Sequence, residues 1–381
     1  MIQSLNRGYN MEYILNEGYD RLERATQANG KYITIDNRKL VDLSMGAGTH
    51  IFGHGTIAKM IKNSLNRGSL FTVPNNIADK CAELLHKVTL FNHFVFCNSG
   101  TEATMRAIRI ARAYTGRDKI VFFDGYWHGT HDYGLTLYST GIPQVIKDMV
   151  IVLPFTDDAF KRIKEKDIAI VMIEPIQSSL PINRGEFLKN LKDICTQTNT
   201  VLCFDEVISG FRVALGGAVE YLGVRPDLVT YGKIIGGGFP VGVIGGDSVM
   251  EVIPTGVRMG GTFSANPITM TACRKSLELL LSTPPYVRIH KVMQELQHIK
   301  TSSFSTMVVG NMGRLMFTSK TPKTIKERDE IELSVEKRKY MSLLLQQSGF
   351  YISSNPHLLF STEHTLDDVD KLQTSLIHLS S

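Results

Sequence analysis

The sequence predicts an α/β protein with a mostly parallel central sheet, and three observations lead to this prediction. Short apolar segments alternate with longer amphipathic ones through the middle of the chain, as strands and helices do in a parallel sheet. The segment Asp167–Ile173 is apolar after its first residue, like strands that are buried on both faces of such a sheet. The chain has 381 residues, 43% of them hydrophobic, which is enough for a sizeable core and for two domains of unequal size.

Each predicted element of the central region has its own local signal. The helix Thr101–Tyr114 gathers alanine and isoleucine residues on one face, and Gly116 follows it as glycine commonly follows a helix end. A second amphipathic pattern predicts a helix over Glu186–Gln197. Short apolar runs bounded by turn residues predict strands over Phe91–Cys97, Lys119–Phe123, Asp167–Ile173, Thr200–Phe204, Leu228–Tyr231 and Val241–Gly245.

The pattern changes after about residue 266, where long helical segments alternate with a few short strands. Thr365–Asp368 has the residues of a capping box, which opens a terminal helix. Near the N-terminus, Tyr32–Val41 predicts two strands joined by a turn. We therefore predict an N-terminal segment (1–45) that packs with a small C-terminal α+β domain (268–381), and a large domain between them (46–267). The C-terminal elements are predicted as helices over Ile268–Leu281 and Asp329–Gln347 and strands over Gly313–Thr318 and Gly349–Ile352.

Composition and charge argue against several classes of protein. Forty-two basic residues face 37 acidic ones, and the net charge of +5 is spread thinly, without the basic cluster that binds nucleic acids or membrane surfaces. The five cysteines are widely spaced and form no C-x-x-C pair, which argues against a disulfide framework and a metal site. The first residues lack the apolar core of a signal peptide, and no apolar stretch is long enough to span a bilayer. We expect a soluble, cytoplasmic protein with neither a nucleic-acid nor a membrane partner.

The segment Asn98–Ala103 follows a predicted strand and opens a predicted helix. It contains Ser99, Gly100 and Thr101, whose small side chains leave backbone N–H groups free at the positive end of the helix. Such an arrangement is suited to binding phosphate. The alternative is an ordinary helix cap, because serine and threonine are favoured at this position in proteins of every kind.

Acidic, basic and aromatic candidates follow further along the chain. Asp205 and Glu206 directly follow an apolar strand, at the edge where parallel sheets bind ligands. Two carboxylates there are suited to binding a metal, to acid–base chemistry or to pairing with a cationic ligand. The alternative is an exposed acidic turn with no such role. Lys233 lies among small and apolar residues and precedes Gly236–Gly238; it is either a desolvated nucleophile for carbonyls or a solvated surface lysine. Trp127, the only tryptophan, lies in a loop bounded by glycines. Its side chain either contacts a ligand or packs in the core.

Taken in chain order, these segments resemble a known family. Lys233 follows Asp205 by 28 residues, and the whole pattern is similar to class III (fold type I) pyridoxal-phosphate aminotransferases, above all the group of glutamate-1-semialdehyde 2,1-aminomutase and its relatives. The resemblance spans roughly residues 20–380 and implies a fold type I transferase that uses pyridoxal 5′-phosphate. The matching stretches are Ser44–His54, Asn98–Ala103, Trp127–Gly129, Glu174–Pro175, Asp205–Arg212, Lys233 with Gly236–Gly242, Gly261–Pro267 and Glu363–Asp368.

The resemblance implies roles for the residues around the cofactor. Lys233 would form the internal aldimine and move the proton between the substrate carbon and the cofactor. Asp205 would keep the pyridinium nitrogen protonated, so that the ring withdraws electrons. Trp127 would stack on one face of the ring, and Val207 would press on the other. The phosphate would be bound by Ser99, Gly100 and Thr101.

Three further residues of the matching stretches have other implied roles. Thr262 would reach the phosphate of the neighbouring subunit's cofactor, which implies a homodimer with shared active sites. His128 belongs to the matching motif, but we assign it no chemistry. Glu206 is interpreted as a structural residue rather than a catalytic one.

Two substrate-facing positions differ from the mutases. The mutases have an N-terminal arginine that faces the substrate carboxylate, for which Arg7 is only a weak stand-in, and a glutamate near the last strand, where Ser353–Phe360 has no acid. We therefore expect an aminotransferase that moves an amino group from a small-molecule donor to an oxo acceptor. The alternative is a true 2,1-aminomutase, an isomerase acting on glutamate 1-semialdehyde or a similar amino aldehyde. Intact Lys233 and Asp205 argue against a third hypothesis, a non-catalytic scaffold.

Overall fold

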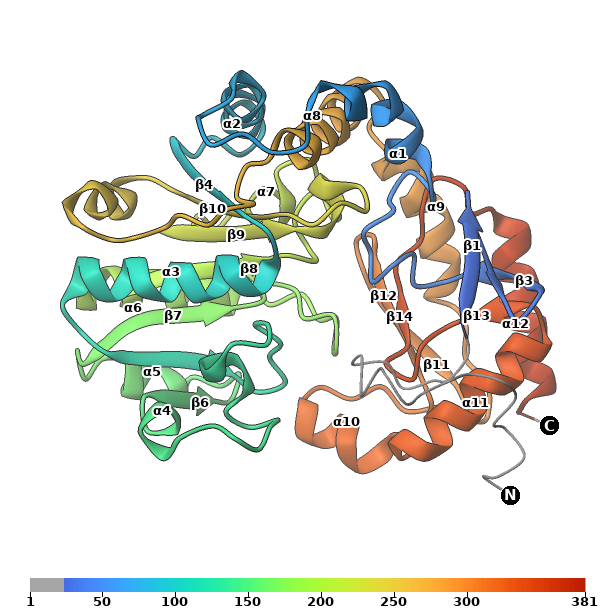
Figure 1. Ribbon diagram of the computed structural model, residues 1–381. Coiled ribbons are helices and arrows are strands. Elements are labelled where there is room, and N and C mark those ends of the chain that lie inside the picture. The colour runs from blue at the N-terminus through green and yellow to red at the C-terminus, as the bar shows by residue number, and fades with distance from the viewer. Residues whose placement is uncertain (1–23, 381) are drawn as a thin grey trace.

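A seven-stranded sheet lies at the centre of the large half of the computed structural model, which describes residues 24–380 (Figure 1). Its strands are β4 (His93–Cys97), β5 (Lys119–Phe123), β6 (Val150–Leu153), β7 (Ile168–Ile173), β8 (Val201–Glu206), β9 (Leu228–Gly232) and β10 (Gly242–Gly246). They follow the order β4-β10-β9-β8-β7-β5-β6. Strand β10 runs antiparallel to both neighbours, while the five strands from β9 to β6 pair in parallel. This arrangement confirms the predicted α/β class.

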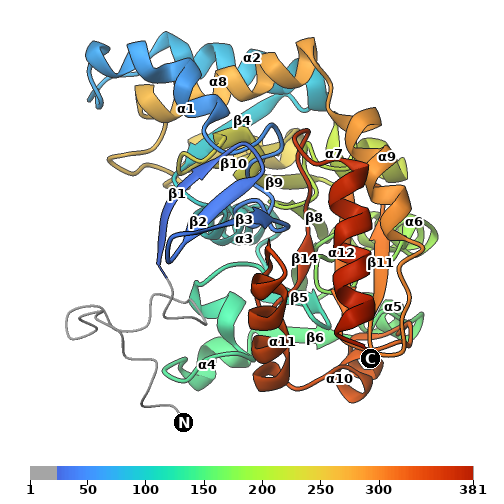
Figure 2. The same cartoon turned by 90° about the vertical axis from the view of Figure 1, so that its right-hand side faces the viewer.

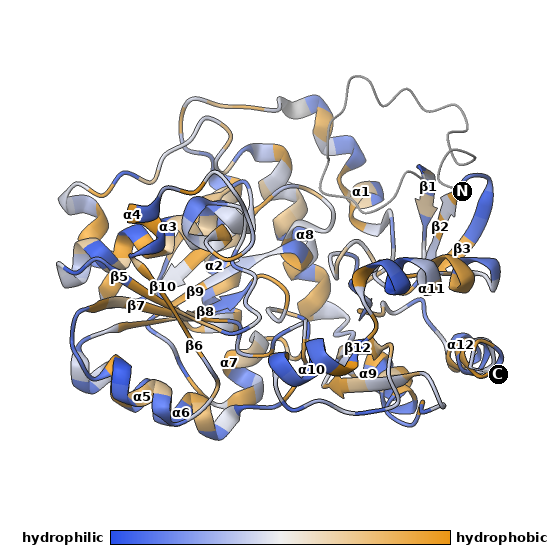
Figure 3. Cartoon of the chain, turned by 90° about the horizontal axis from the view of Figure 1, so that it is seen from below, coloured by the Kyte–Doolittle hydropathy of each residue, from blue (hydrophilic) through white to orange (hydrophobic). Residues whose placement is uncertain are grey.

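Helices cover both faces of the central sheet. The helices of this half of the chain are α1 (Thr56–Ile61), α2 (Asn76–Thr89), α3 (Gly100–Thr115), α4 (Gln144–Lys147), α5 (Asp158–Ile163), α6 (Gly185–Thr198), α7 (Gly217–Leu222) and α8 (Pro267–Ser282), with 3-10 turns η2 (Lys62–Arg67), η3 (Asp132–Leu135), η4 (Lys233–Gly236) and η5 (Ser248–Thr255). Successive strand residues point to opposite faces. Cys203 therefore joins the core beneath α3, while Phe204 joins the core beneath α6. Figure 3 shows hydrophobic residues along the strands and hydrophilic ones on the outer turns of α5 and α6.

Two smaller sheets accompany the large one. The first contains β1 (Ala25–Asn29), β2 (Tyr32–Ile35), β3 (Arg38–Asp42) and β13 (Phe350–Tyr351), and the second contains β11 (Ser305–Val309), β12 (Met312–Met316) and β14 (His357–Leu358). Helices α9 (Tyr286–Leu296), α10 (Ile325–Ile331), α11 (Val335–Gln347) and α12 (Leu366–His378) complete this part of the chain. Among residues 24–380, no helix has both the length and the apolar character needed to cross a membrane.

Strand β3 pairs in parallel with β13, so a segment near the N-terminus lies beside the C-terminal elements (Figure 2). The predicted hairpin over Tyr32–Val41 is confirmed, and its turn residues Asp36 and Asn37 have φ angles of 46° and 64°, as a two-residue hairpin turn requires. The predicted domain boundaries stay predictions. Residues 1–23 of the predicted N-terminal segment, with Arg7, lie outside the described residues.

Helix α3 begins and ends for the local reasons that the sequence indicates. The Ser99 hydroxyl accepts the N–H of Glu102 at 3.1 Å, and the Glu102 carboxylate accepts the N–H of Asn98 at 3.1 Å. Gly116 ends the helix with a φ of 67°. The capping box predicted over Thr365–Asp368 also forms, at the start of α12.

The predicted single helix over Asp329–Gln347 is wrong, because the chain leaves the helical conformation at Glu332. The buried Glu332 carboxylate lies 2.9 Å from the guanidinium of Arg314 and 3.3 Å from that of Arg338. With this side chain held inside, residue 332 has an extended conformation. Ser334 then caps a new helix, so two helices, α10 and α11, replace the predicted one.

A buried arginine joins three segments that are far apart in the sequence. Arg212 lies shortly after β8, and its guanidinium donates hydrogen bonds of 2.6 Å to the carbonyl oxygens of Gly48 and Phe360. Burial lowers the pKa of Arg212 to about 10, which leaves it charged at neutral pH. Gly48 follows β3 and Phe360 follows β14, so Arg212 fixes both small sheets onto the loop at the carboxyl end of β8.

Removal of this guanidinium should destabilise the fold. In Arg212→Leu, the buried carbonyl oxygens of Gly48 and Phe360 lose their donors, and each unsatisfied group costs about 1–3 kcal/mol. We expect the free energy of unfolding, measured by urea denaturation, to fall by at least about 2 kcal/mol. Arg288→Leu, at an exposed position of α9, is the matched control and should change it by less than about 0.5 kcal/mol. Equal losses in the two variants would contradict the role given to Arg212.

Candidate active site

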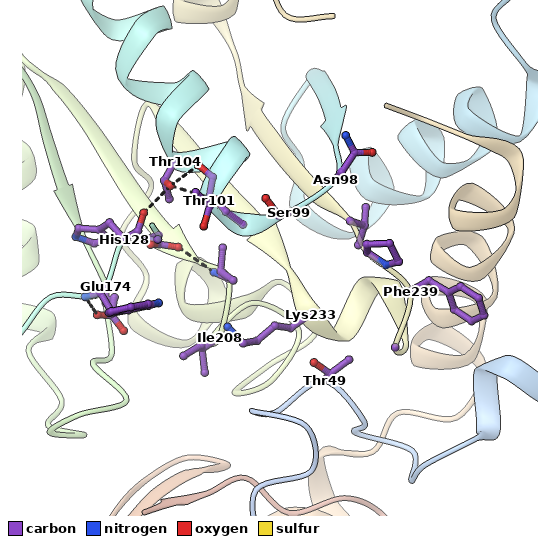
Figure 4. A pocket seen from close by; sticks show the side chains of 18 residues that line it. Thr49, Asn98, Ser99, Thr101, Thr104, His128, Glu174, Ile208, Lys233 and Phe239 are labelled. Carbon is purple, nitrogen blue, oxygen red and sulfur yellow. Dashed lines mark hydrogen bonds and ion pairs between the residues drawn. The ribbon is translucent and has the colours of Figure 1, made fainter. Parts of the chain in front are cut away.

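The carboxyl ends of β4, β5, β7, β8 and β9 meet at one edge of the central sheet, which is where parallel sheets bind ligands. A cavity of about 420 Å³ lies at this edge (Figure 4). Its walls come from the loops that follow these strands and from the segment that leads into β10. The predicted site residues that line it are Ser99, Gly100, Thr101, Trp127, Asp205, Val207 and Lys233.

The N-terminus of α3 forms a cradle of backbone N–H groups at one end of the cavity. Helix geometry leaves the N–H groups of Gly100 and Thr101 without an acceptor inside the helix, and the helix dipole makes this end positive. Neighbouring segments approach closely through glycines: a β-carbon on Gly242 would lie 2.0 Å from the Ser99 carbonyl oxygen, and one on Gly129 would lie 2.6 Å from the Thr101 hydroxyl. The cradle suits an anion with several oxygens, such as phosphate.

The Asp205 carboxylate is fixed on three sides at the end of β8. It accepts the hydroxyl of Thr230 at 3.0 Å and the N–H of Val207 at 3.2 Å, and it lies 2.8 Å from Nδ1 of His128. Nε2 of His128 is buried and has no partner within residues 24–380. The ring therefore donates to the carboxylate through Nδ1. Asp205 is held in the cavity wall by donors from three separate segments.

Strand alternation separates Glu206 from its neighbour Asp205. The Glu206 carboxylate points to the other face of the sheet, where it accepts the N–H of Ala218 at 2.6 Å and the hydroxyl of Ser209 at 2.9 Å. Burial raises the pKa of Glu206 to about 7, although these hydrogen bonds lower it. The side chain does not line the cavity, and its contacts at the start of α7 agree with the structural interpretation.

Lys233 begins η4 directly after β9, with a φ of 46° that is unusual for a residue other than glycine. Such a conformation costs about 1–3 kcal/mol and persists only where surrounding contacts impose it. Burial lowers the pKa of Lys233, while the charges of Asp205 and Glu174 raise it. Along residues 24–380, no hydrogen bond or ion pair holds its Nζ. A buried amine that loses its proton readily is a nucleophile for carbonyl groups.

Trp127 and Val207 line the cavity from the loops after β5 and β8. Val207 packs against the cradle so closely that a β-carbon on Gly100 would lie 2.9 Å from its methyl groups. The Trp127 side chain is 51% exposed, and its backbone N–H donates to Glu174 at 2.9 Å. The two side chains offer an apolar and an aromatic surface for a flat ring.

The sequence analysis gave no role to several residues of the cavity wall, and one residue that it assigned to the partner's cofactor lies outside the cavity of its own chain. Asn98, Thr49 and Glu174 lie inside the matching stretches, so the only signal for them was the resemblance. Thr262 is exposed and does not line the cavity of its own chain. Its contact with a partner's cofactor stays a prediction.

The residues of the cavity fit pyridoxal 5′-phosphate. The cradle at α3 supplies N–H groups for the phosphate, and the unpaired amine of Lys233 suits the carbonyl carbon. The Asp205 carboxylate suits a protonated ring nitrogen. Glycines at positions 100, 129 and 242 keep the cradle free of side chains that would fill it or displace its walls.

Comparisons with known proteins identify the family. The family model for class-III aminotransferases matches residues 15–376. The chain is 36% identical to glutamate-1-semialdehyde 2,1-aminomutase of Thermodesulfovibrio yellowstonii, over 91% of this chain and 88% of that protein. It is 35% identical to the enzyme of that name from Sulfolobus acidocaldarius, over 88% and 87%. An omega-transaminase from Sphaerobacter thermophilus is 29% identical, with a TM-score of 0.86 over 99% of this chain and 95% of that one.

These similarities cover nearly the whole chain and agree with the geometry of the cavity. They confirm the predicted family, the fold type I architecture, the enzymatic activity and the cofactor. The chain therefore belongs to the class-III aminotransferases, pyridoxal-phosphate enzymes that act as aminotransferases or aminomutases on small molecules with amino and oxo groups.

Proposed function

We propose that this enzyme is an intermolecular aminotransferase, which takes an amino group from one small molecule and passes it to the oxo group of another. The observation that carries the proposal is the segment Ser353–Phe360, which has no acid where the mutase pattern has a glutamate. Its His357 ring is neutral at physiological pH, because burial and the charges of Arg314, Lys233 and Arg328 lower its pKa to about 3. The lack of a carboxylate in this segment favours a substrate other than glutamate 1-semialdehyde.

A true 2,1-aminomutase is the second candidate. The specific observation in its favour is that the two aminomutases compared above are 35% and 36% identical over most of the chain. The omega-transaminase, at 29% identity, supports the first candidate. The two activities use the same cofactor chemistry and differ in whether the substrate leaves the enzyme between the two transfers of nitrogen.

The roles proposed for the cavity residues follow from their contacts. Pyridoxal phosphate supplies a carbonyl that condenses with amines and a ring that withdraws electrons from the adjacent carbon. Lys233 would hold that carbonyl through Nζ and would serve as the base and acid for the proton at the substrate carbon. Asp205 would stabilise a protonated ring nitrogen. Gly100 and Thr101 bind the phosphate through backbone N–H groups, with Ser99 beside them.

We also propose a homodimer in which each subunit completes the other's site. Thr262 is exposed on a loop with Gly260 and Gly261, and the next residue, Phe263, is 62% exposed. A large apolar side chain beside a flexible segment is typical of a surface that another protein covers. In this arrangement the Thr262 hydroxyl donates to the phosphate bound by the partner.

The requirement for a second substrate separates the two candidate functions. We expect the purified holoenzyme to convert an amino donor to its oxo product only when an oxo acceptor is added, as measured by chromatography of both products across a panel of donors. Lys233→Ala is the control and should show no turnover. Rearrangement of glutamate 1-semialdehyde with no added acceptor would establish the mutase instead.

The charge of Asp205 should be essential for turnover. Asp205→Asn preserves the volume of the side chain but removes the negative charge next to the ring nitrogen. Electrostatic stabilisation of this kind is worth about 3 kcal/mol, so we expect kcat to fall at least about a hundredfold. Glu206→Gln, the same change at the next residue but outside the cavity, should stay within about tenfold of the wild type. If kcat of Asp205→Asn also stayed within about tenfold of the wild type, the Asp205 charge would not be what stabilises the ring nitrogen.

The shared site can be tested by mass and by cofactor retention. Light scattering of dilute holoenzyme should give twice the mass of one chain. Thr262→Ala removes one hydrogen bond to a charged group, about 1.5–3 kcal/mol, so it should release the cofactor faster on dialysis while the dimer persists. A stable and active monomer would exclude the role proposed for Thr262.

A further inference from the structure

Glu174 is a buried carboxylate in the cavity wall to which the functions above assign no part. It follows β7 directly, its residue is 7% exposed, and its Oε1 accepts the backbone N–H of Trp127 at 2.9 Å. Figure 4 shows it beside His128, at the side of the cavity toward which the Lys233 side chain extends. It is therefore in contact with the loop that carries the aromatic wall and lies near the amine that binds the cofactor.

Glu174 changes its charge in the range of physiological pH. Burial raises its pKa to about 7, and the negative charge of Asp205 raises it further, while His128 and the N–H groups of Trp127 and Ser178 lower it. The charged and titratable groups that face it come from every neighbouring segment: Asp205 from β8, His128 from the loop after β5, Tyr138 from the end of that loop, and Lys233 from η4.

We propose that Glu174 is a positioning residue that couples the position of the Trp127 loop to the protonation of Lys233. The proposal rests on the role assigned above to Lys233. It adds a function for a residue that, within residues 24–380, forms no hydrogen bond with the phosphate cradle or with Asp205, and it makes the site responsive to pH near neutrality.

The coupling follows from one hydrogen bond and one electrostatic interaction of the same carboxyl group: it accepts the Trp127 N–H, and its charge acts on Lys233 across the cavity. Below its pKa, Glu174 is protonated and neutral, so of the two acids that raise the pKa of Lys233 only Asp205 still does so. As pH rises through about 7, Glu174 becomes charged, its hydrogen bond from the Trp127 N–H becomes charge-assisted, and the ammonium form of Lys233 gains a second negative neighbour. Deprotonation of Glu174 thus tightens the loop and holds the proton on Lys233 to higher pH.

The chain contains its own reporter for the loop, because Trp127 is the only tryptophan. We expect the intrinsic fluorescence of the wild-type apoenzyme to change with pH, with a midpoint near 7. Glu174→Gln keeps an acceptor for the Trp127 N–H but cannot titrate, so this transition should disappear. Glu206→Gln is the matched control, since Glu206 has a pKa of about 7 but lies outside the cavity, and it should keep the transition. A transition that persists in Glu174→Gln would overturn the proposal.

The second readout is the reactivity of the Lys233 amine. Apoenzyme is mixed with pyridoxal phosphate at a series of pH values, trapped with borohydride, and mapped for the modified lysine. In Glu174→Gln, the midpoint of labelling at Lys233 should shift to lower pH, because one of the charges that raise the lysine pKa is gone. A purely structural role for Glu174 predicts no shift, which would overturn the coupling. Labelling at a different lysine in the wild type would refute the proposed function instead, whatever the fluorescence shows.

Discussion

The position of the Asp205 carboxylate is the constraint on which the rest of the site depends. A carboxylate at the end of a buried strand needs donors, and here they come from the next strand, through Thr230, from the following loop, through Val207, and from the loop after β5, through His128. Since each donor belongs to a different segment, the contacts of one side chain set the distances between β8, β9 and the loop of Trp127. The contacts of Asp205 therefore hold together the segments that form this part of the cavity wall.

Close backbone packing imposes the second constraint, at the other end of the cavity. Gly242 lies at the start of β10, the one antiparallel strand of the large sheet, and its α-carbon faces the Ser99 carbonyl so closely that no side chain fits between them. This contact presses the start of α3 against the sheet. The N–H groups of Gly100 and Thr101 are consequently fixed relative to Asp205, although the cradle follows β4 and the acid lies at the end of β8.

The sequence predicted the cofactor side of the site because its residues lie at the ends of parallel strands, and topology brings such ends together. The residues alone left the roles of the adjacent acids Asp205 and Glu206 open, and only the resemblance distinguished them. Strand alternation in the structure places the two side chains on opposite faces of the sheet. Long-range contacts were beyond the reach of the sequence: the pairing of Glu332 with Arg314 interrupts a helical pattern that is continuous in the sequence. Helices α2 and α9, which are amphipathic, and strand β6 were also missed; β6 has only four residues, all apolar, and so short an apolar run does not distinguish a strand from a buried piece of helix.

The groups whose charges act on Lys233 lie mostly on the central sheet. Within residues 24–380, the acids that raise the pKa of Lys233 are Asp205 and Glu174, both on the central sheet. The C-terminal elements contribute His357, which is neutral at physiological pH. A carboxylate in place of this ring would stabilise the ammonium form of Lys233 from the C-terminal side as well. Without it, the protonation of the lysine depends on the cofactor side of the cavity, so the C-terminal segment can vary with the substrate while the chemistry of Lys233 is preserved.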